Sequence, residues 1–269
     1  SAGAGAGRGR VKLRILGSGT SSGVPRIGGA DGAGDWGDCD PLEPRNRRTR
    51  ASILVESATT RLLIDTSPDL REQLLAARVA DIDAVIWTHD HADHCHGIDD
   101  LRQLYHARGR PIRGLARPAT LNSLAARFAY AFNGRSAYPP IATLAPLPDR
   151  VEIGDMVIET VDQPHGDIWS AGLRFTFDGK TIAYSTDFHE LTDAMAALYT
   201  GVDLWVVDAL RRRPHPSHPT LAQTLRWASS LGVERAVLVH MDQSMDYATL
   251  VRELPPGIVP GYDGMEIRL

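Results

Sequence analysis

The stretch Thr88–His94, with the sequence THDHADH, decides the fold of this chain of 269 residues. It continues the short apolar run DAVIWT, which predicts a buried strand. In an extended chain alternate side chains share a face, so His89 and His91 can reach the same metal ion. The turn that follows presents Asp93 and His94 to a neighbouring position. Neutral imidazole suits zinc and a carboxylate accepts zinc or manganese, so the motif predicts a metal site at the end of this strand.

Candidate ligands also occur at the ends of three later strands. His165 follows a predicted strand, within the tetrapeptide QPHG, and Asp187 follows the predicted strand Lys180–Ser185. His240 comes directly after the predicted strand Arg235–Val239. A single histidine at a strand end is more often a core or surface residue than a ligand. Layered α/β folds, however, place functional residues on loops at strand ends, so together with the first motif these residues form a consistent ligand set.

The order of strands and helices predicts one large layered domain. Strands cluster in the N-terminal half and again in the C-terminal half, and each cluster is followed by alternating strands and helices. Two sheets packed face to face with helices outside would give such a chain one core. Predicted strands are 11–16, 51–56, 61–65, 83–88, 151–161, 171–177, 180–185, 203–208 and 235–239, with a short terminal strand. Predicted helices are 68–78, 97–106, 119–132, 191–199, 220–231 and 247–254.

Composition argues against several classes of protein. No run of about 18 apolar residues occurs, which argues against a membrane-spanning helix. The net charge of -4 disfavours a broad surface for long nucleic acid. Two cysteines, Cys39 and Cys95, cannot form a disulfide framework and favour a reducing, cytoplasmic location. Residues 1–10 are typical of a disordered leader or a cloning scar, so we place the single domain at 11–269.

The order H-x-H-x-D-H, His, Asp, His resembles the metallo-β-lactamase fold superfamily, and the match covers nearly the whole of 11–269. The resemblance implies an α/β fold, a four-layer αββα sandwich in which two mixed sheets pack face to face with helices outside. It also implies a dinuclear centre in the cleft between the sheets, with zinc, manganese or iron as the divalent ions. The implied ligands are His89, His91 and His165 for one metal, Asp93, His94 and His240 for the second, and Asp187 as the bridge.

The segment RRRPHPSHPT at 211–220 narrows the resemblance to the phosphodiesterase branches. They carry a histidine just before a Thr or Ser that starts a helix, where His218 and Thr220 stand here. With the opening GSGTSSGVP, the segment resembles the branch of phosphonate-pathway cyclic phosphodiesterases and ribonuclease Z. The implied reaction is hydrolysis of a small cyclic or nucleotide phosphodiester, similar to a phosphoribosyl cyclic phosphate, by a metal-bridging hydroxide. His218 would act as the general acid, and the predicted catalytic residues are Asp93 and His218.

Two departures from that branch leave the substrate open. Phosphonate-pathway enzymes hold a structural zinc in a cysteine-rich stretch, whereas here that stretch contains only Cys39, and we predict no structural zinc there. Ribonuclease Z grips transfer RNA with a protruding Gly/Pro-rich arm, and the sequence has no obvious arm. We therefore expect a small phosphodiester or nucleotide as partner, no membrane and no long nucleic acid. The alternatives are a lactone or thiolester hydrolase, ribonuclease Z-like RNA processing, and a non-catalytic nucleotide-binding module.

Several other residues have roles that the sequence leaves open. Asp65 and Asp208, at strand ends, are predicted to orient ligating imidazoles. The arginines at 45, 47, 48 and 50 either bind phosphate or are held by carboxylates. Residues 103–150 either line the substrate cleft or form a homodimer contact. Cys95 is predicted to be a small packing residue, and the histidines at 96, 106, 189 and 215 are predicted to lie around the site or on the surface without binding metal.

Overall fold

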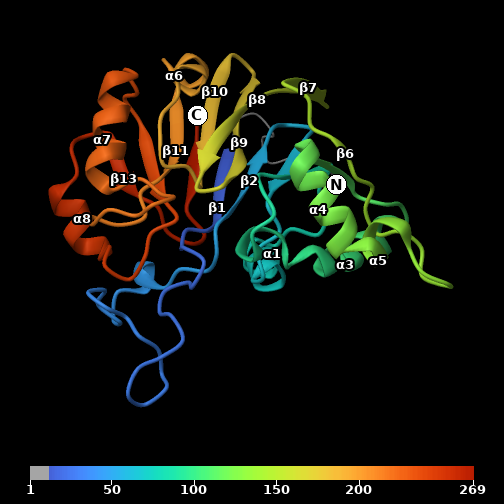
Figure 1. Cartoon of the computed structure of the whole chain (residues 1–269), viewed down its shortest axis with the longest axis horizontal. Helices are drawn as coiled ribbons and strands as arrows, with labels where there is room; N and C mark the ends of the chain where they lie inside the picture. Colours follow the sequence, from blue (N-terminus) through green and yellow to red (C-terminus); the bar gives the residue numbers. More distant parts are fainter. Residues whose placement is uncertain (1–11) are drawn as a thin grey trace, which may run out of the picture.

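Two mixed sheets of seven strands, packed face to face, form the centre of the molecule in a computed structural model that describes residues 12–269 (Figure 1). The predicted leader at 1–10 lies outside the described residues. The first sheet has the strand order β14-β1-β2-β3-β4-β5-β6, and the second has the order β13-β12-β11-β10-β9-β8-β7. The four-layer αββα architecture predicted from the sequence is thereby confirmed.

Each sheet combines an antiparallel half with a parallel half. In the first sheet β14, β1, β2 and β3 pair antiparallel and β3 to β6 pair parallel; in the second sheet β7 to β10 pair antiparallel and β10 to β13 pair parallel. The strands of the first sheet are β1 (Lys12–Gly17), β2 (Ser52–Glu56), β3 (Arg61–Ile64), β4 (Ala84–Trp87), β5 (Arg113–Ala116), β6 (Ala145–Pro146) and β14 (Glu266–Arg268). Those of the second are β7 (Arg150–Ile153), β8 (Met156–His165), β9 (Ile168–Phe177), β10 (Lys180–Ser185), β11 (Leu204–Asp208), β12 (Ala236–Val239) and β13 (Ile258–Pro260).

Helices cover the outer faces of both sheets (Figure 1). The first sheet is covered by α1 (Leu70–Ala77), α3 (Leu101–Arg108), α4 (Pro118–Arg127) and α5 (Ala129–Asn133), and the second by α6 (Asp193–Tyr199), α7 (Leu221–Ser230) and α8 (Tyr247–Glu253). Short helices α2 (Ala92–Cys95), η1 (Pro44–Asn46) and η2 (Ile98–Asp100) lie in the connections. Within residues 12–269, none of the helices has the length and apolar character needed to cross a membrane.

The period-two alternation of strand side chains builds these layers. In β3, Leu62 and Ile64 belong to the core between the sheets, whereas Leu63 packs against the helices outside. In β11, Val206 faces the central core and Val207 faces the outer helices of the second sheet. Burying such an aliphatic side chain contributes about 1.5–3 kcal/mol. Strands buried on both faces therefore read as continuous apolar runs, which is why they were predictable.

Several segments differ from the predicted elements. The predicted strand 151–161 is a hairpin of β7 and β8 that turns at Gly154, where φ is +59°, and β8 then continues to His165. The helix predicted over 119–132 is divided at Phe128 into α4 and α5. The strands β5 and β6 were not predicted, because RGLA and AP are short and contain Gly or Pro, which weaken a strand pattern.

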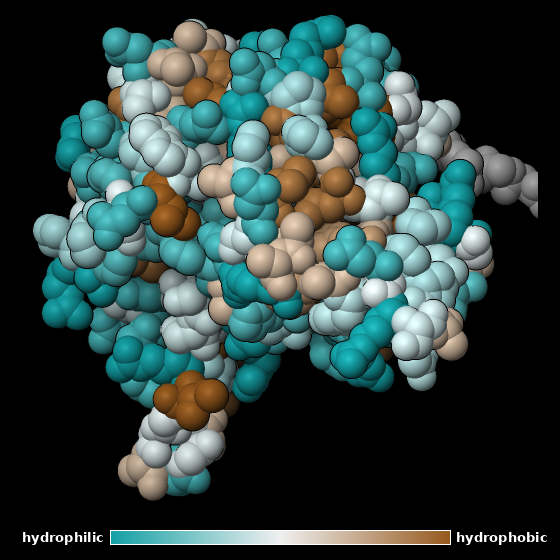
Figure 2. Space-filling model, turned by 45° about the vertical axis from the view of Figure 1, so that its right-hand side comes forward, coloured by the Kyte–Doolittle hydropathy of each residue, from teal (hydrophilic) through white to brown (hydrophobic). Residues whose placement is uncertain are grey.

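Residues 24–36 form a loop that projects from the body of the molecule, at the bottom of both Figure 1 and Figure 2. Backbone hydrogen bonds of 3.1 and 2.9 Å pair Arg26 with Asp35, and the side chain of Ile27 is fully exposed. This loop is a projecting segment of the described residues, and whether it acts as an arm of the ribonuclease Z kind stays untested. The charged residues of the loop are Arg26, Asp31 and Asp35, and Arg26 is paired with Asp35 at 2.7 Å. The loop offers no net positive charge to a nucleic-acid backbone.

Each arginine of the 45–50 segment contacts a group of the protein itself. Arg45 pairs with Glu43 at 2.6 Å and lies 4.1 Å from the Tyr247 ring centroid, and Arg47 lies 5.0 Å from the Trp36 ring centroid. Arg48 is buried and donates to the carbonyls of Asp242 (3.2 Å) and Met245 (2.5 Å), with the Cys39 sulfur 3.8 Å away. Arg50 lies 2.9 Å from a carboxylate oxygen of Asp69. Arg45 and Arg50 are thus held by carboxylates, as one of the two alternatives predicted, whereas Arg47 lies against an aromatic ring and Arg48 donates to carbonyls.

Candidate metal centre

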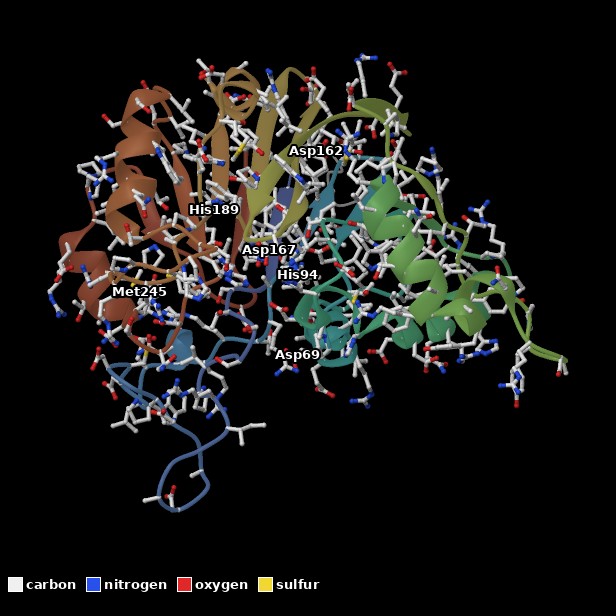
Figure 3. The ribbon with its side chains drawn as sticks, in the orientation of Figure 1. Asp69, His94, Asp162, Asp167, His189 and Met245 are labelled. Carbon is white, nitrogen blue, oxygen red and sulfur yellow. The ribbon has the colours of Figure 1, made fainter. Side chains whose placement is uncertain are left out.

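The carboxyl ends of the parallel strands meet at one edge of the molecule, and the candidate metal centre lies there. Strand β4 leads to His89, β10 leads to Asp187, and β12 leads to His240. A backbone hydrogen bond of 2.8 Å from Ala171 N–H to Thr88 O joins the second sheet to the end of β4. Open α/β sheets bind ligands outside the carboxyl ends of their strands. All the ligands predicted from the sequence gather at this edge, around the middle of the view in Figure 3, where His94 is labelled.

Three residues at this edge adopt backbone conformations that are rare for residues other than glycine. Asp65, Asp187 and His240 have φ values of 64°, 57° and 58°. The left-handed region costs a non-glycine residue about 1 kcal/mol or more. Each of them comes directly, or one residue, after the end of a strand. Strain of this kind persists only where surrounding contacts hold the backbone, and it clusters at functional sites.

A first group of donors contains His89, His91, His165 and Asp187, whose donor atoms lie within 4.8 Å of one another. His165 Nε2 lies 3.2 Å from His91 Nδ1 and 3.4 Å from Asp187 Oδ1. His89 Nε2 lies 3.7 Å from the same carboxylate oxygen. His89 and His165 are buried, and His91 is exposed. The group contains every residue that the sequence assigned to the first metal.

A second group contains Asp93, His94 and His240, whose donor atoms also lie within 4.8 Å of one another. His94 Nε2 lies 3.2 Å from Asp93 Oδ2, and His240 Nε2 lies 3.5 Å from that oxygen. Both imidazoles also approach the second oxygen of Asp187, Oδ2, at 3.2 and 3.5 Å. Asp187 thus directs Oδ1 toward the first group and Oδ2 toward the second.

Divalent cations fit this donor set. The Nε2 atoms of His89, His94 and His240 are buried and have no hydrogen-bond partner among residues 12–269. A buried polar atom without a partner costs about 1–3 kcal/mol, so these nitrogens require a partner of another kind. Imidazole nitrogens together with carboxylate oxygens are the donors that zinc and manganese accept.

Hydrogen bonds to the other ring nitrogens orient the imidazoles. Asp65 Oδ2 lies 2.7 Å from His94 Nδ1, and Asp65 itself accepts from the backbone and hydroxyl of Thr88 at 2.7 and 2.8 Å. His165 Nδ1 lies 2.9 Å from the carbonyl oxygen of Ser217. Partners of this kind fix the tautomer of an imidazole and direct its remaining nitrogen. Asp65 has the contact that the sequence predicted for it.

The carboxylates of the centre favour positive charge around them. Burial alone would raise the pKa of Asp187, but the imidazoles of His240, His94 and His89 hold that pKa well below its usual value. Burial alone would lower the pKa of His240, and Asp187 together with Asp208 raises it to about 9. Burial and the neighbouring imidazoles lower the pKa of His89 well below its usual value. The carboxylates thus favour positive charge on His240, whereas the lowered pKa of His89 favours its neutral imidazole, which is the form that binds a metal.

His218 lies beside both groups, at the edge of the centre. Its Nδ1 lies 2.8 Å from Asp208 Oδ2, and its Nε2 lies 3.8 Å from Asp187 Oδ1. The ring stacks on His240 with centroids 4.8 Å apart, and its side chain is 10% exposed. The loop that carries it is fixed by Thr220, which caps α7 in a reciprocal capping box with Gln223. Thr220 therefore stands at the start of a helix, as the sequence predicted.

Asp208 was predicted to orient a ligating histidine, and its nearest imidazole is that of His218 instead. It lies 3.9 Å from His240 Nδ1, and it accepts the backbone N–H of Asp187 at 3.0 Å. Thr186, which the sequence did not single out, donates its hydroxyl to Asp187 Oδ2 at 2.6 Å. Its position beside a predicted ligand was the only signal in the sequence.

The remaining histidines lie outside the two groups. His189 accepts the backbone N–H of Gly166 at 3.2 Å, and the His215 ring centroid lies 5.0 Å from that of His218. His96 is exposed and contacts Arg127 at 2.9 Å. Cys95 is buried among the apolar residues outside the first sheet, where it was predicted to pack.

Comparison with known sequences gives one family match and three relatives. The family described as Beta-lactamase superfamily domain matches residues 60–241. An octanoyltransferase of Porphyromonas gingivalis is 34% identical over 263 residues, which cover 94% of this chain and 50% of that protein. The exodeoxyribonuclease WalJ of two Streptococcus pneumoniae strains is 23% identical over 167 residues, which cover 59% of this chain and 57% of that protein. The chain therefore spans about half the length of the curated relatives it matches.

Solved structures of the same fold superpose on this chain. A diphosphatase from the PhnP family superposes with a TM-score of 0.87 and 34% identity, covering 97% of each chain. The short form of human tRNase Z superposes with a TM-score of 0.66 and 16% identity, covering 95% of this chain and 98% of that one, which shows the shared fold alone. The fold implies divalent metal ions at the His and Asp groups. The chain belongs to the β-lactamase superfamily and, through its 34% identity over nearly its whole length, to the PhnP family.

Proposed function

We propose that this enzyme hydrolyses a small phosphodiester, either a cyclic phosphate or a nucleotide ester, with His218 as the general acid. The observation that carries the proposal is the pair formed by His218 and Asp208, whose facing atoms are 2.8 Å apart beside the two donor groups. The diphosphatase that is 34% identical over nearly the whole chain supports chemistry at a phosphoryl group. Hydrolysis of a lactone or thiolester remains the alternative, and the leaving group of the substrate distinguishes the two.

The metal ligands in this proposal are those implied by the motif order, divided as the two donor groups are. His89, His91 and His165 would hold the first metal, Asp93, His94 and His240 would hold the second, and Asp187 would contribute to both. Zinc or manganese suits these donors, and iron is the further candidate. When bound, two divalent ions supply positive charge to the phosphoryl oxygens and a deprotonated water at neutral pH.

The residues around the metals prepare the proton transfer. Asp208 accepts from Nδ1 of His218, which leaves Nε2 directed toward the centre, 3.8 Å from Asp187 Oδ1. In this tautomeric arrangement a protonated His218 donates from Nε2 to the leaving oxygen as its bond to phosphorus breaks. Asp208 stabilises the imidazolium before transfer, in the way that a carboxylate supports a catalytic imidazole in other hydrolases. A leaving alkoxide needs this proton far more than a leaving phenolate does.

The substrate test uses this difference between leaving groups. The protein loaded with manganese or zinc is assayed on bis-p-nitrophenyl phosphate and on 2′,3′-cyclic nucleotides, as wild type and as His218→Ala. We expect chelator-sensitive turnover of both, and a loss in the variant of about 10²-fold or more on the cyclic nucleotide only. His215→Ala is the matched control, because its ring lies 5.0 Å from His218 and its Nδ1 contacts Ser217 instead of Asp208.

Two outcomes would contradict the proposal. If no phosphodiester is turned over by protein that contains both metals, the substrate class is wrong, and lactones and thiolesters come next. If His218→Ala loses the same factor on both substrates, His218 is not the proton donor. A uniform loss would instead favour a role in binding metal, since His218 shares a donor cluster with Asp187 and His240.

A further inference from the structure

A chain of buried hydrogen bonds runs from the helices outside the second sheet to the peptide of Asp187. The hydroxyl of Tyr199, in α6, donates to Gln163 Oε1 at 2.8 Å. Gln163 Nε2 donates to Ser170 Oγ and to the carbonyl of Thr186, each at 3.0 Å. The Ser170 hydroxyl donates to the carbonyl of Asp187 at 2.7 Å. All of these side chains are at most 2% exposed.

The direction of the Gln163 amide is fixed by its partners, and the Ser170 hydroxyl has the carbonyl of Asp187 at 2.7 Å as its closer acceptor and that of Thr186 at 3.3 Å as the longer one. A carbonyl oxygen only accepts, so the amide nitrogen of Gln163 must face Thr186 and its amide oxygen must face Tyr199. Ser170 then accepts from Gln163 and donates to Asp187. No buried donor or acceptor along the path is left without a partner, and a fully satisfied polar network specifies a single arrangement of its members.

Gly172 shows that the path is built into the sheet. A Cβ atom at this position in β9 would lie 1.7 Å from the Tyr199 hydroxyl oxygen and 2.6 Å from Gln163 Oε1. The hydrogen bond between Tyr199 and Gln163 therefore passes directly over Gly172, and no other residue type leaves room for it.

The carbonyls that receive these donors have lost their sheet partners. Strand β10 pairs with β11 only as far as Ser185, so the carbonyls of Thr186 and Asp187 lie beyond the ladder. Buried carbonyls need donors, and Gln163 and Ser170 supply them where the backbone cannot. The N–H of Asp187 is held by Asp208 at 3.0 Å and its carboxylate by Thr186 at 2.6 Å.

We propose that Gln163, Ser170 and Tyr199 are positioning residues for Asp187. They hold its peptide in the left-handed conformation with φ of 57°, which directs its two carboxylate oxygens to the two donor groups. Through Asp187 they set how tightly the centre binds metal and how the bound metals are arranged. The inference rests on the proposed metal-bridging role of Asp187 and is independent of the substrate.

The test compares two variants of the network with one control. Gln163→Met keeps the approximate volume and removes both ends of the link, while Tyr199→Phe removes only the outer hydrogen bond. Trp205→Phe is the control. Trp205 lies in the same layer, with its ring centroid 5.7 Å from that of Tyr199, but its own hydrogen bond goes to Ser185 Oγ at 2.7 Å and to no member of this network. Metal affinity is measured by competition with a chelator, and the visible absorption spectrum of the cobalt-loaded protein reports on ligand geometry.

We expect Gln163→Met to weaken metal binding about 10- to 100-fold, the range seen when a hydrogen-bond partner of a ligand is lost. Tyr199→Phe should weaken it less, and both should change the cobalt spectrum. Where turnover is measurable, kcat should fall with KM unchanged. Trp205→Phe should lower the melting temperature while leaving affinity and spectrum as in the wild type.

The inference would be overturned if Gln163→Met kept the metal affinity and the cobalt spectrum of the wild type. It would also be overturned if Trp205→Phe lost as much metal affinity as Gln163→Met. If Gln163→Met fails to fold, Tyr199→Phe alone decides by the same two measurements. A wild-type protein that binds two metals but hydrolyses no phosphodiester would overturn the proposed substrate and leave this inference standing. A wild-type protein that binds no metal would remove both.

Discussion

Two carboxylate–imidazole pairs stand at the ends of the two sheets, and they are nearly identical in their geometry. At the first sheet Asp65 lies 2.7 Å from His94 Nδ1, and at the second sheet Asp208 lies 2.8 Å from His218 Nδ1. The far sides of the rings differ. His94 Nε2 is fully buried between two carboxylate oxygens, each 3.2 Å away, whereas the closest carboxylate oxygen to His218 Nε2 is 3.8 Å away and the ring is 10% exposed.

The comparison suggests how one orienting contact can serve two kinds of chemistry under the proposed function. A carboxylate on one ring nitrogen directs the other nitrogen, and the surroundings of that other nitrogen decide its use. Enclosure among carboxylates suits His94 to the metal-binding role that we propose for it. An open edge, where a leaving group can approach, suits His218 to the proposed role of proton donor.

The largest effect is expected from His94→Ala. Removing this imidazole takes a ligand from the second donor group, so the protein should retain one metal of two. Losing a metal removes several kcal/mol of charge stabilisation, and turnover should fall on the order of 10³-fold or more for every phosphodiester. Metal content after dialysis, beside turnover, checks both statements. If the variant still binds two metals, His94 is not a ligand, and the proposed difference between His94 and His218 is wrong.

A smaller and more selective effect is expected from Asp208→Asn. Without the carboxylate the imidazolium of His218 loses its stabilising partner, so turnover of a substrate with a poor leaving group should fall about 10²-fold or more. The loss should depend on the leaving group as it does in His218→Ala. Combining the two changes should add little to either, because they disable one unit. Additive losses would show that Asp208 acts by a separate route, such as its contact with Asp187.

Asp65→Asn should weaken metal binding and should not affect proton transfer to the leaving group. The predicted result is about 10- to 100-fold weaker metal binding, with activity restored by excess metal. The remaining turnover should show the leaving-group dependence of the wild type. Chelator competition and the leaving-group series separate this variant from Asp208→Asn. Identical behaviour of the two variants would mean that the pairs are not functionally distinct.

The smallest effect is expected from Asp246→Ala, which removes a carboxylate that belongs to neither pair. Asp246 caps α8 by accepting from Thr249 N–H at 2.9 Å, and it accepts from Asn46 at 2.7 Å. Partial burial would raise the pKa of Asp246, but these hydrogen bonds lower it to about 2. The variant should lose about 1 kcal/mol of stability and no metal.

The sign of the pH dependence follows from that lowered pKa. The folded protein binds the proton of Asp246 less readily than the unfolded chain, whose pKa is about 3.9. The stabilisation is therefore fully present above about pH 4 and is lost as the pH falls toward about 2. Denaturation curves of wild type and Asp246→Ala should converge over that interval. A constant difference at every pH would contradict the assignment.

The fold and the ligand positions were largely predictable, for identifiable reasons. Strands buried on both faces are apolar runs, and the motif from His89 to His94 compresses several donors into one turn. His165, Asp187 and His240 were found because each stands at a strand end, and their order matched a known pattern. The sequence identified these three residues as a set of candidate ligands, but it could not give the distances between their donor atoms.

The parts that were not predictable depend on contacts between distant residues. Strand β5 has the sequence RGLA, which is not typical of a strand. It forms because β4 and β6 pair with it on both sides. Gln163 and Ser170 carry no motif, and their role arises only when β8, β9 and the end of β10 are side by side. Arg48 reads as part of a basic run, and only the folded chain shows it buried on the carbonyls of Asp242 and Met245.

The buried guanidinium of Arg48 also constrains the order in which the chain can fold. Its carbonyl partners lie 194 and 197 residues further along the sequence. A charged side chain cannot be enclosed before its partners are present, because the desolvation penalty would then be uncompensated. The segment around Arg48 leaves the ribosome before the segment around Met245 and must stay solvated until that segment has been made. Proteolytic sites between Gly28 and Arg48 should therefore become protected no earlier than sites around Met245 during refolding.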